Sequence, residues 1–176
     1  GVLGGLVAIT APTATVDPWA AVVIGLIAGA IIVFGVELLD RLQIDDPVGA
    51  VPVHLMNGIW GTLAVGLFTS QVFMVDAFGV ETESYGLLLG GGWNMLGIQA
   101  LGVAAVAAWT LALSTVLFVG IRVTIGLRVS PAEEELGLDV GEHGMEAYPE
   151  FTGARDPFGM HAGTALAGGD DAAPAA

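Results

Sequence analysis

The fold class is decided by the stretch from Pro47 to Phe68, which reads Pro-Val-Gly-Ala-Val-Pro-Val-His-Leu-Met-Asn-Gly-Ile-Trp-Gly-Thr-Leu-Ala-Val-Gly-Leu-Phe. It is long enough to cross a bilayer, because a spanning helix needs about 20 mostly apolar residues. His54 is its single ionisable residue, and no other ionisable residue lies between Asp46 and Asp76. An ionisable side chain at membrane depth is costly, and therefore marks a candidate functional site.

Outward from this stretch, the sequence predicts four membrane spans. They are the short segment Val2–Val16, Pro18 to about Val36, Pro47 to about Ser70, and about Met95 to Ile125. An acid precedes a proline at Asp17-Pro18 and again at Asp46-Pro47, a pattern typical of a capped helix start. The sequence therefore predicts an all-α polytopic membrane protein. Because the first span is short and no Met precedes it, the chain is expected to be a fragment.

The composition supports the membrane prediction. Of the residues, 55% are hydrophobic and 12% are charged, with a mean hydropathy of +0.80, whereas a soluble domain carries about 25% charged residues. The net charge is −14, and the four basic residues are all Arg. This charge disfavours nucleic-acid binding. Since the chain has no Lys, it also fits a halophilic protein of a high-salt cytoplasm, with a compositional accident as the alternative.

The arginines predict the orientation of the spans. Arg41 follows the second span, and Arg122 and Arg128 close the fourth, whereas the loop Gln71–Asn94 has no basic residue. Because basic residues concentrate in cytoplasmic loops, we expect the C-terminal tail to be cytoplasmic.

The helical spacing around His54 suggests its surroundings. In an α-helix Asn57, Gly58 and Gly61 lie on the same side as His54, so we expect the imidazole and Asn57 to face protein or a narrow cavity. A neutral imidazole has one donor and one acceptor, and could pass a proton or bind a small polar molecule. The alternative is a structural histidine that bonds a neighbouring helix. No second metal ligand stands one turn away, so neither a metal site nor a cofactor is predicted, and no catalytic constellation indicates an enzyme.

Several stretches resemble the Amt/Mep/Rh ammonium transporter family. They are Gly4–Ala11, Pro18–Ala21, Gly35–Leu63 with Asp46-Pro47 and His54, Leu96–Ala105, Gly126–Val129 and Glu133–Tyr148. They cover about Gly4 to Tyr148 in the order of the family. The resemblance implies a fold of eleven spans, in which two inverted five-helix repeats surround a pore and a long eleventh helix follows, assembled as a homotrimer. This chain would supply the last four spans.

The resemblance also implies roles for single residues. His54 matches the second member of a pore histidine pair, whose first member belongs to the opposite repeat. Ammonium would be captured outside and deprotonated, and ammonia would pass along the paired imidazoles, which serves nitrogen uptake. Asp46 and Pro47 match a repeated helix start and are expected to cap the helix; Asn57 is expected to line the pore without a known family role.

By the same resemblance, residues 1–126 form the membrane domain and residues 127–150 form a cytoplasmic regulatory tail, where a PII-type signalling protein docks in many members. The tail residues implied are Gly126, Arg128, Asp139, His143, Gly144 and Tyr148. Residues 151–176, rich in Gly, Ala and Asp, are expected to be disordered.

Two other functions remain open beside transport of ammonium or ammonia. The same membrane body could sense ammonium and signal through its tail, or could be a regulatory membrane subunit that does not transport. The isolated 176 residues are expected not to conduct, since half of each pore wall would be missing.

Overall fold

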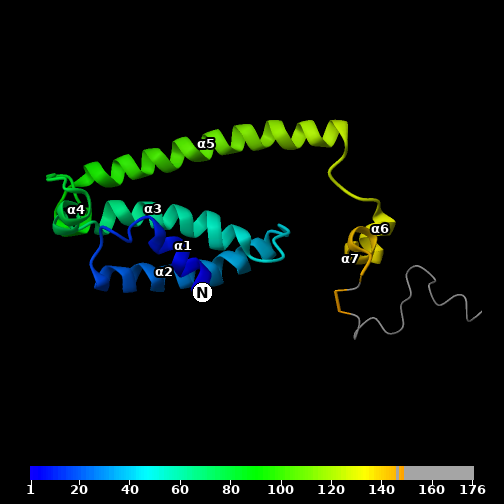
Figure 1. Cartoon of the computed structure of the whole chain (residues 1–176), viewed down its shortest axis with the longest axis horizontal. Coiled ribbons are helices and arrows are strands. Elements are labelled where there is room, and N and C mark those ends of the chain that lie inside the picture. The colour runs from blue at the N-terminus through cyan, green and yellow to red at the C-terminus, as the bar shows by residue number, and fades with distance from the viewer. Residues whose placement is uncertain (146, 149–176) are drawn as a thin grey trace, which may run out of the picture. The chain divides into compact units, whose positions relative to one another are not determined.

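The computed structural model describes residues 1–145 and 147–148, and contains two compact units, Gly1–Ser114 and a second that begins at Thr115. Within the described residues the secondary structure is helical, apart from an isolated bridge between Val16 and Thr69. The elements (Figure 1) are α1 (Val2–Thr10), α2 (Pro18–Arg41), the π-helix η1 (Val51–Met56), α3 (Asn57–Phe68), α4 (Gln71–Phe78), the 3₁₀ turn η2 (Leu87–Leu89), α5 (Trp93–Thr124), α6 (Pro131–Leu136) and α7 (Leu138–His143).

Three of these helical segments are long and apolar enough to cross a membrane, among the residues that the structure describes. They are Pro18–Arg41, Val51–Phe68 and Trp93–Thr124. The first predicted span is a helix of only 9 residues, Val2–Thr10. The second span continues to Arg41, whose guanidinium pairs with Glu37 at 2.6 Å one turn earlier.

The segment predicted as a plain loop, Gln71–Asn94, contains α4 and η2, and its last two residues open α5. α4 ends at Phe78 and is capped by Gly79, whose φ of +65° favours glycine because a Cβ is disfavoured there.

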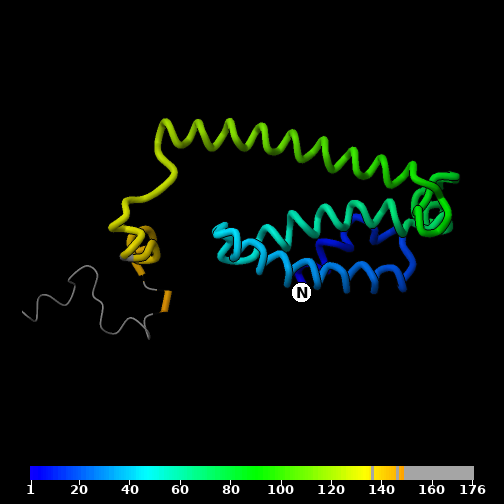
Figure 2. Tube along the Cα trace, turned by 180° about the vertical axis from the view of Figure 1, so that it is seen from behind, coloured from blue at the N-terminus to red at the C-terminus, as the bar shows by residue number. Residues whose placement is uncertain are grey.

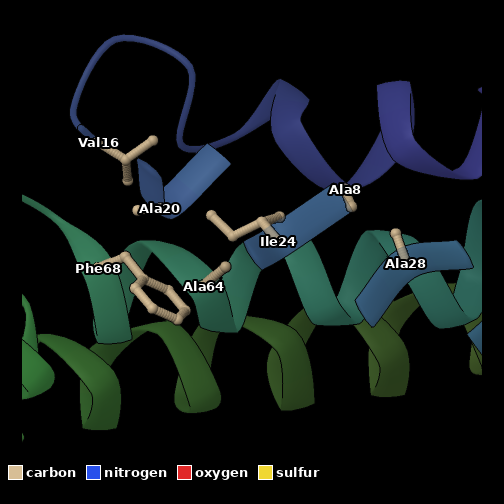
Figure 3. Close-up of a cluster of buried hydrophobic side chains, with 7 residues drawn as sticks. All are labelled: Ala8, Val16, Ala20, Ile24, Ala28, Ala64 and Phe68. Carbon is tan, nitrogen blue, oxygen red and sulfur yellow. The ribbon is translucent and has the colours of Figure 1, made fainter. Parts of the chain in front are cut away.

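The core lies between α1, α2 and α3, and small side chains dominate it. Figures 1 and 2 show α1 lying against both longer helices. Ala20, Ile24 and Ala28 form a buried stripe on α2 with a spacing of four residues. The buried cluster in Figure 3 consists of Ala8, Val16, Ala20, Ile24, Ala28, Ala64 and Phe68. Small residues allow helix backbones to approach closely in lipid, where packing replaces the hydrophobic effect.

Glycines make the closest approaches within this core. A Cβ on Gly61 of α3 would lie 2.4 Å from the carbonyl oxygen of Ala8 in α1. A Cβ on Gly35 of α2 would lie 3.0 Å from Cβ of Pro52. The first half of α3 and the π-helix before it are therefore held tightly against two other helices.

Candidate functional site

The site begins at the turn before the third span, where Asp46 accepts two backbone hydrogen bonds. Its Oδ1 accepts from Ala50 N–H and its Oδ2 from Val51 N–H, each at 2.8 Å. The Asp46 carbonyl accepts from Gly49 N–H at 3.1 Å. Pro47 lies in this turn, so the helix begins later than the predicted start at Pro47. The two bonds satisfy N–H groups that have no partner inside a helix.

Asp17, the other predicted cap, stands at the N-cap position of α2 but makes no side-chain capping bond. Its backbone carbonyl accepts from Ala21 N–H at 3.1 Å. The same acid-proline pattern therefore gives two different helix starts.

Pro52 fits the first turn of the third span because a proline there removes an N–H that needs no partner inside the helix. Val53 N–H donates to the Gly49 carbonyl at 3.1 Å, so the hydrogen bonding resumes directly after Pro52. The residues Val51–Met56 then form a π-helix. Single π-helical turns are rare and frequently occur at functional sites.

His54 lies in the middle of this π-helix, and its side chain is exposed. Asn57, three residues later, is fully buried. His54 and Asn57 are thus not exposed on one common face of the third span, as α-helical spacing would place them, and a role of Asn57 in lining a pore stays a prediction. The wider turn of a π-helix, closed by bonds across five residues, turns the two side chains further apart than α-helical spacing would.

The Asn57 amide donates to two carbonyls. Its Nδ2 lies 3.0 Å from the Pro52 oxygen and 3.5 Å from the Ala28 oxygen on α2. Its Oδ1 has no hydrogen-bond partner among the described residues. Sequence analysis missed this role, although the spacing of Pro52 and Asn57 by five residues was an available signal.

One turn further along α3, Trp60 forms a second polar link to α2. Its indole Nε1–H donates to the Ile24 carbonyl at 3.1 Å, and its ring meets Phe68 edge to face with centroids 6.5 Å apart. The buried side of the third span is thus bonded to α2, whereas the side with His54 is not covered by α1 or α2.

The α2–α3 turn also has a shallow hollow of about 300 Å³, lined by Asp40, Gln43, Ile44, Asp45, Asp46 and Pro47. Within the described chain, no group of three potential metal-ligating side chains converges.

The tail residues lie in the second unit. Gly126, with a φ of +86°, follows α5 and donates to the Ile121 carbonyl at 3.0 Å. Arg128 donates from Nε to Glu134 at 2.9 Å. Ser130 and Glu133 form a reciprocal capping box at the start of α6, and the Ser130 hydroxyl and backbone N–H, which donate to this carboxylate, lower the pKa of Glu133.

Asp139 ties the end of the described tail to α7. Its carboxylate accepts from Ala147 N–H at 2.9 Å, and this bond is the largest cause that lowers the pKa of Asp139 from its ordinary 3.8. His143 ends α7, and Gly144, with a φ of +67°, caps it. Tyr148 is exposed. The predicted disordered segment 151–176 lies outside the described residues.

This architecture is that of an all-α polytopic membrane protein, and solved structures confirm the prediction. A structure titled "Sensor Amt Protein" matches with a TM-score of 0.66 and 38% identity, over 80% of this chain and 32% of that one. The crystal structure of Saccharomyces cerevisiae Mep2 matches with a TM-score of 0.68 and 29% identity, over 74% of this chain and 29% of that one.

The sequence comparisons give the family. The family model of the Ammonium Transporter Family matches residues 1–148, and the chain belongs to this family. Its members are channels and transporters, not enzymes.

Two curated relatives show how much of the whole protein is covered. Ammonium transporter Amt2 of Archaeoglobus fulgidus is 43% identical over 151 residues, which are 86% of this chain and 32% of the relative. Ammonium transporter 1 member 2 of Oryza sativa subsp. japonica is 36% identical over 148 residues, which are 84% of this chain and 30% of the relative. The chain thus spans about a third of the length of these relatives.

Proposed function

We propose that this chain forms part of the wall of a pore that conducts ammonium or ammonia across the cell membrane, and that His54 lines that pore. The names of the relatives, which are ammonium transporters, support the substrate. Since the chain covers about a third of those relatives, the rest of the pore wall comes from polypeptide outside this region. The isolated 176 residues are accordingly expected not to conduct.

The observation that carries the proposal is the exposure of His54 within a membrane-spanning segment. An ionisable side chain at membrane depth faces protein or a water-filled cavity rather than lipid. In the described chain, neither α1 nor α2 covers the imidazole, because they pack on the side of Pro52 and Asn57. A pore beside His54 accounts for a polar ring on this face.

The chemistry follows from the imidazole and the cation. Moving the charged ammonium ion into an apolar pore has a high free-energy cost, so ammonium must lose a proton before it passes. A neutral imidazole accepts a hydrogen bond at one nitrogen and donates one at the other. It can therefore bind ammonia and relay a proton to a second histidine, which the family resemblance assigns to the opposite repeat.

The helix start at Asp46 belongs to the same proposal. We infer that Asp46 and Pro47 serve a structural role, in which the carboxylate caps the helix that carries His54. The two bonds to Ala50 and Val51 N–H support this role, because an acidic cap satisfies free N–H groups.

For the assembly, we propose a homotrimer with a cytoplasmic tail formed by residues 127–150, and a PII-type protein as a partner at that face. Basic residues at Arg41, Arg122 and Arg128 support the orientation. The tail residues Gly126, Arg128, Asp139, His143, Gly144 and Tyr148 would form the regulatory surface. The net charge of −14 without Lys supports a high-salt cytoplasm.

An ammonium sensor is the second candidate function, with a regulatory subunit that does not transport as a variant of it. The observation in favour is the structural match to the protein titled "Sensor Amt Protein". A sensor and a transporter share the membrane body, so they differ in flux rather than in fold.

The test is uptake of labelled methylammonium by cells that express the gene product carrying this chain, as wild type and as His54→Ala. Saturable uptake that falls in His54→Ala, or changes its dependence on membrane potential, supports a pore with His54 in it. Leu55→Ala is the matched control, because Leu55 is the exposed neighbour in the same π-helix. Ammonium binding without any uptake would favour the sensor, and equal uptake by wild type and His54→Ala would contradict the role of His54.

A further inference from the structure

The buried amide of Asn57 is a polar group that the transport proposal does not use. Asn57 is fully buried, and burying an amide is unfavourable unless it is hydrogen-bonded. Its Nδ2 donates to the Pro52 carbonyl at 3.0 Å. The backbone N–H of Asn57 donates to the same carbonyl and to that of His54. One carbonyl oxygen thus accepts from both the backbone and the side chain of a residue five positions later.

A bond across five residues is the defining bond of a π-helix. The side-chain bond of Asn57 closes the same loop a second time, because it ends on the same oxygen. A side chain without a donor would leave the π-helical turn with the backbone bond alone. The π-helical turn would then be less stable relative to the competing α-helical arrangement, which has bonds across four residues.

The neighbouring helices are shaped to receive this turn. A Cβ on Gly35 of α2 would lie 3.0 Å from Cβ of Pro52 and 2.9 Å from Sδ of Met56. A Cβ on Gly4 of α1 would lie 2.7 Å from Nδ2 of Asn57. Glycines in both helices therefore leave space for the two ends of the bond. The weaker contact from Nδ2 to the Ala28 carbonyl at 3.5 Å links the turn to α2.

His54 lies between Pro52 and Asn57 in the sequence, on the opposite side of this turn. Pro52 and Asn57 are buried and His54 is exposed. Any change of the turn from π-helical to α-helical hydrogen bonding changes the rotation of residue 54 about the helix axis. The direction of the imidazole is therefore coupled to the Asn57–Pro52 bond.

We propose that Asn57 is a positioning residue for His54, which holds the π-helical turn so that the imidazole faces the permeation pathway. This inference rests on the proposed role of His54 in the pore. Among the described residues, the Asn57 side chain bonds the Pro52 and Ala28 carbonyls and not the imidazole, so it acts on His54 through the Pro52 carbonyl. An apolar side chain in its place keeps the burial but loses both donated bonds.

The experiment is a double-mutant cycle in the gene product that carries this chain. Methylammonium uptake and the current per transported molecule are measured for wild type, His54→Ala, Asn57→Leu and the double variant. We expect Asn57→Leu to lower uptake about 10- to 100-fold, as small misplacements of a reacting group do, and to change the current ratio in the direction of His54→Ala. The double variant should match His54→Ala, because Asn57 acts through His54.

Trp60→Phe is the matched control. It also removes an interhelical bond from α3 to α2, the one to the Ile24 carbonyl at 3.1 Å, but lies outside the π-helix. It should lower stability without changing the current ratio. Two results would overturn the inference. In the first, the double variant shows lower uptake than His54→Ala, which means that the two effects add. In the second, Asn57→Leu changes uptake and current ratio only as much as Trp60→Phe does.

Gly35→Ala decides the case if Asn57→Leu does not fold. Its added methyl contacts Pro52 from α2 and leaves the Asn57 side chain in place. It should therefore change the current per transported molecule in the same direction as Asn57→Leu. An unchanged current ratio counts against the inference. If His54→Ala itself leaves uptake and current unchanged, the pore role of His54 fails. If His54→Ala changes both and the Asn57 and Gly35 variants do not, only the positioning role fails.

Discussion

Replacing Gly61 by alanine tests how closely α1 and α3 must approach each other. The added Cβ would lie 2.4 Å from the carbonyl oxygen of Ala8 and 3.0 Å from its carbonyl carbon. Non-bonded carbon atoms settle at about 3.5–4.0 Å, so one helix must move by about 1 Å. The obstructing atoms are backbone, and Ala8 is fully buried, so no side-chain rotation can relieve the contact.

The expected cost follows from a matched control in the same helix. Overpacking in a tightly packed core costs about 1–3 kcal/mol, whereas alanine in place of a helical glycine gains about 0.5–1 kcal/mol. Gly58→Ala has the same helical gain, but its Cβ meets nothing within 4 Å. The helical gain is common to both variants, so it drops out of the difference between their unfolding free energies. That difference should be about 1–3 kcal/mol, with Gly61→Ala the less stable variant.

The assay is unfolding of the purified protein in detergent, followed by circular dichroism against denaturant or temperature. We expect Gly61→Ala to unfold earlier than wild type, and Gly58→Ala to unfold at the same point or later. Equal unfolding midpoints for the two variants would refute the close approach of α1 and α3. A lower midpoint for Gly58→Ala alone would show that the packing of the two faces of α3 is reversed.

Three further predictions concern the cap, the tail and the net charge. Asp46→Ala should lower the unfolding free energy by about 0.5–2 kcal/mol, because two N–H groups lose their acceptor; an unchanged thermal midpoint would contradict this cap. The lowered pKa of Asp139 means that its stabilisation of the tail is complete above the unfolded pKa, and is lost as pH falls through the lowered folded pKa. Hydrogen exchange at the Ala147 amide, corrected for intrinsic pH dependence, should therefore accelerate on acidification in wild type, and an equal response in Asp139→Asn would disprove the link. With a net charge of −14, the acidic groups repel one another, and added salt screens this repulsion. The screening length falls from about 10 Å to about 3 Å between about 0.1 M and about 1 M KCl, so the thermal unfolding midpoint should rise over this range. A midpoint that stays constant or falls with salt would count against adaptation to high salt.

Much of the fold follows from local sequence, because apolar length and helix-start residues act within one segment. Pro18 opens α2 as predicted, and the apolar run up to Ile125 becomes α5, which ends at Thr124. The predicted second span ends at about Val36, whereas α2 continues to Arg41. In the structure Glu37 and Arg41 pair along one more turn of the helix.

The site was less predictable, because its geometry depends on contacts between distant residues. α-Helical spacing placed Asn57 beside His54, but the turn between them is π-helical. That turn is supported by Gly35 and by the Ala28 carbonyl on α2, which no pattern within Pro47–Phe68 reveals. The roles of His54 and of the tail residues stay predictions.

The length of α5 sets how it sits in a bilayer. Its 32 residues extend about 48 Å at about 1.5 Å per residue, against a hydrocarbon thickness of about 30 Å. Even at a tilt of about 40°, the upper end of the usual range, the helix still covers about 37 Å along the membrane normal. Even at this tilt α5 is about 7 Å longer than the hydrocarbon layer, so at least one of its ends lies among the lipid headgroups. Trp93 opens the helix and Arg122 lies in its last turn, and both residue types are suited to anchoring at that interface. A bilayer with a hydrocarbon layer several ångströms thicker can therefore still be spanned by α5, at a smaller tilt.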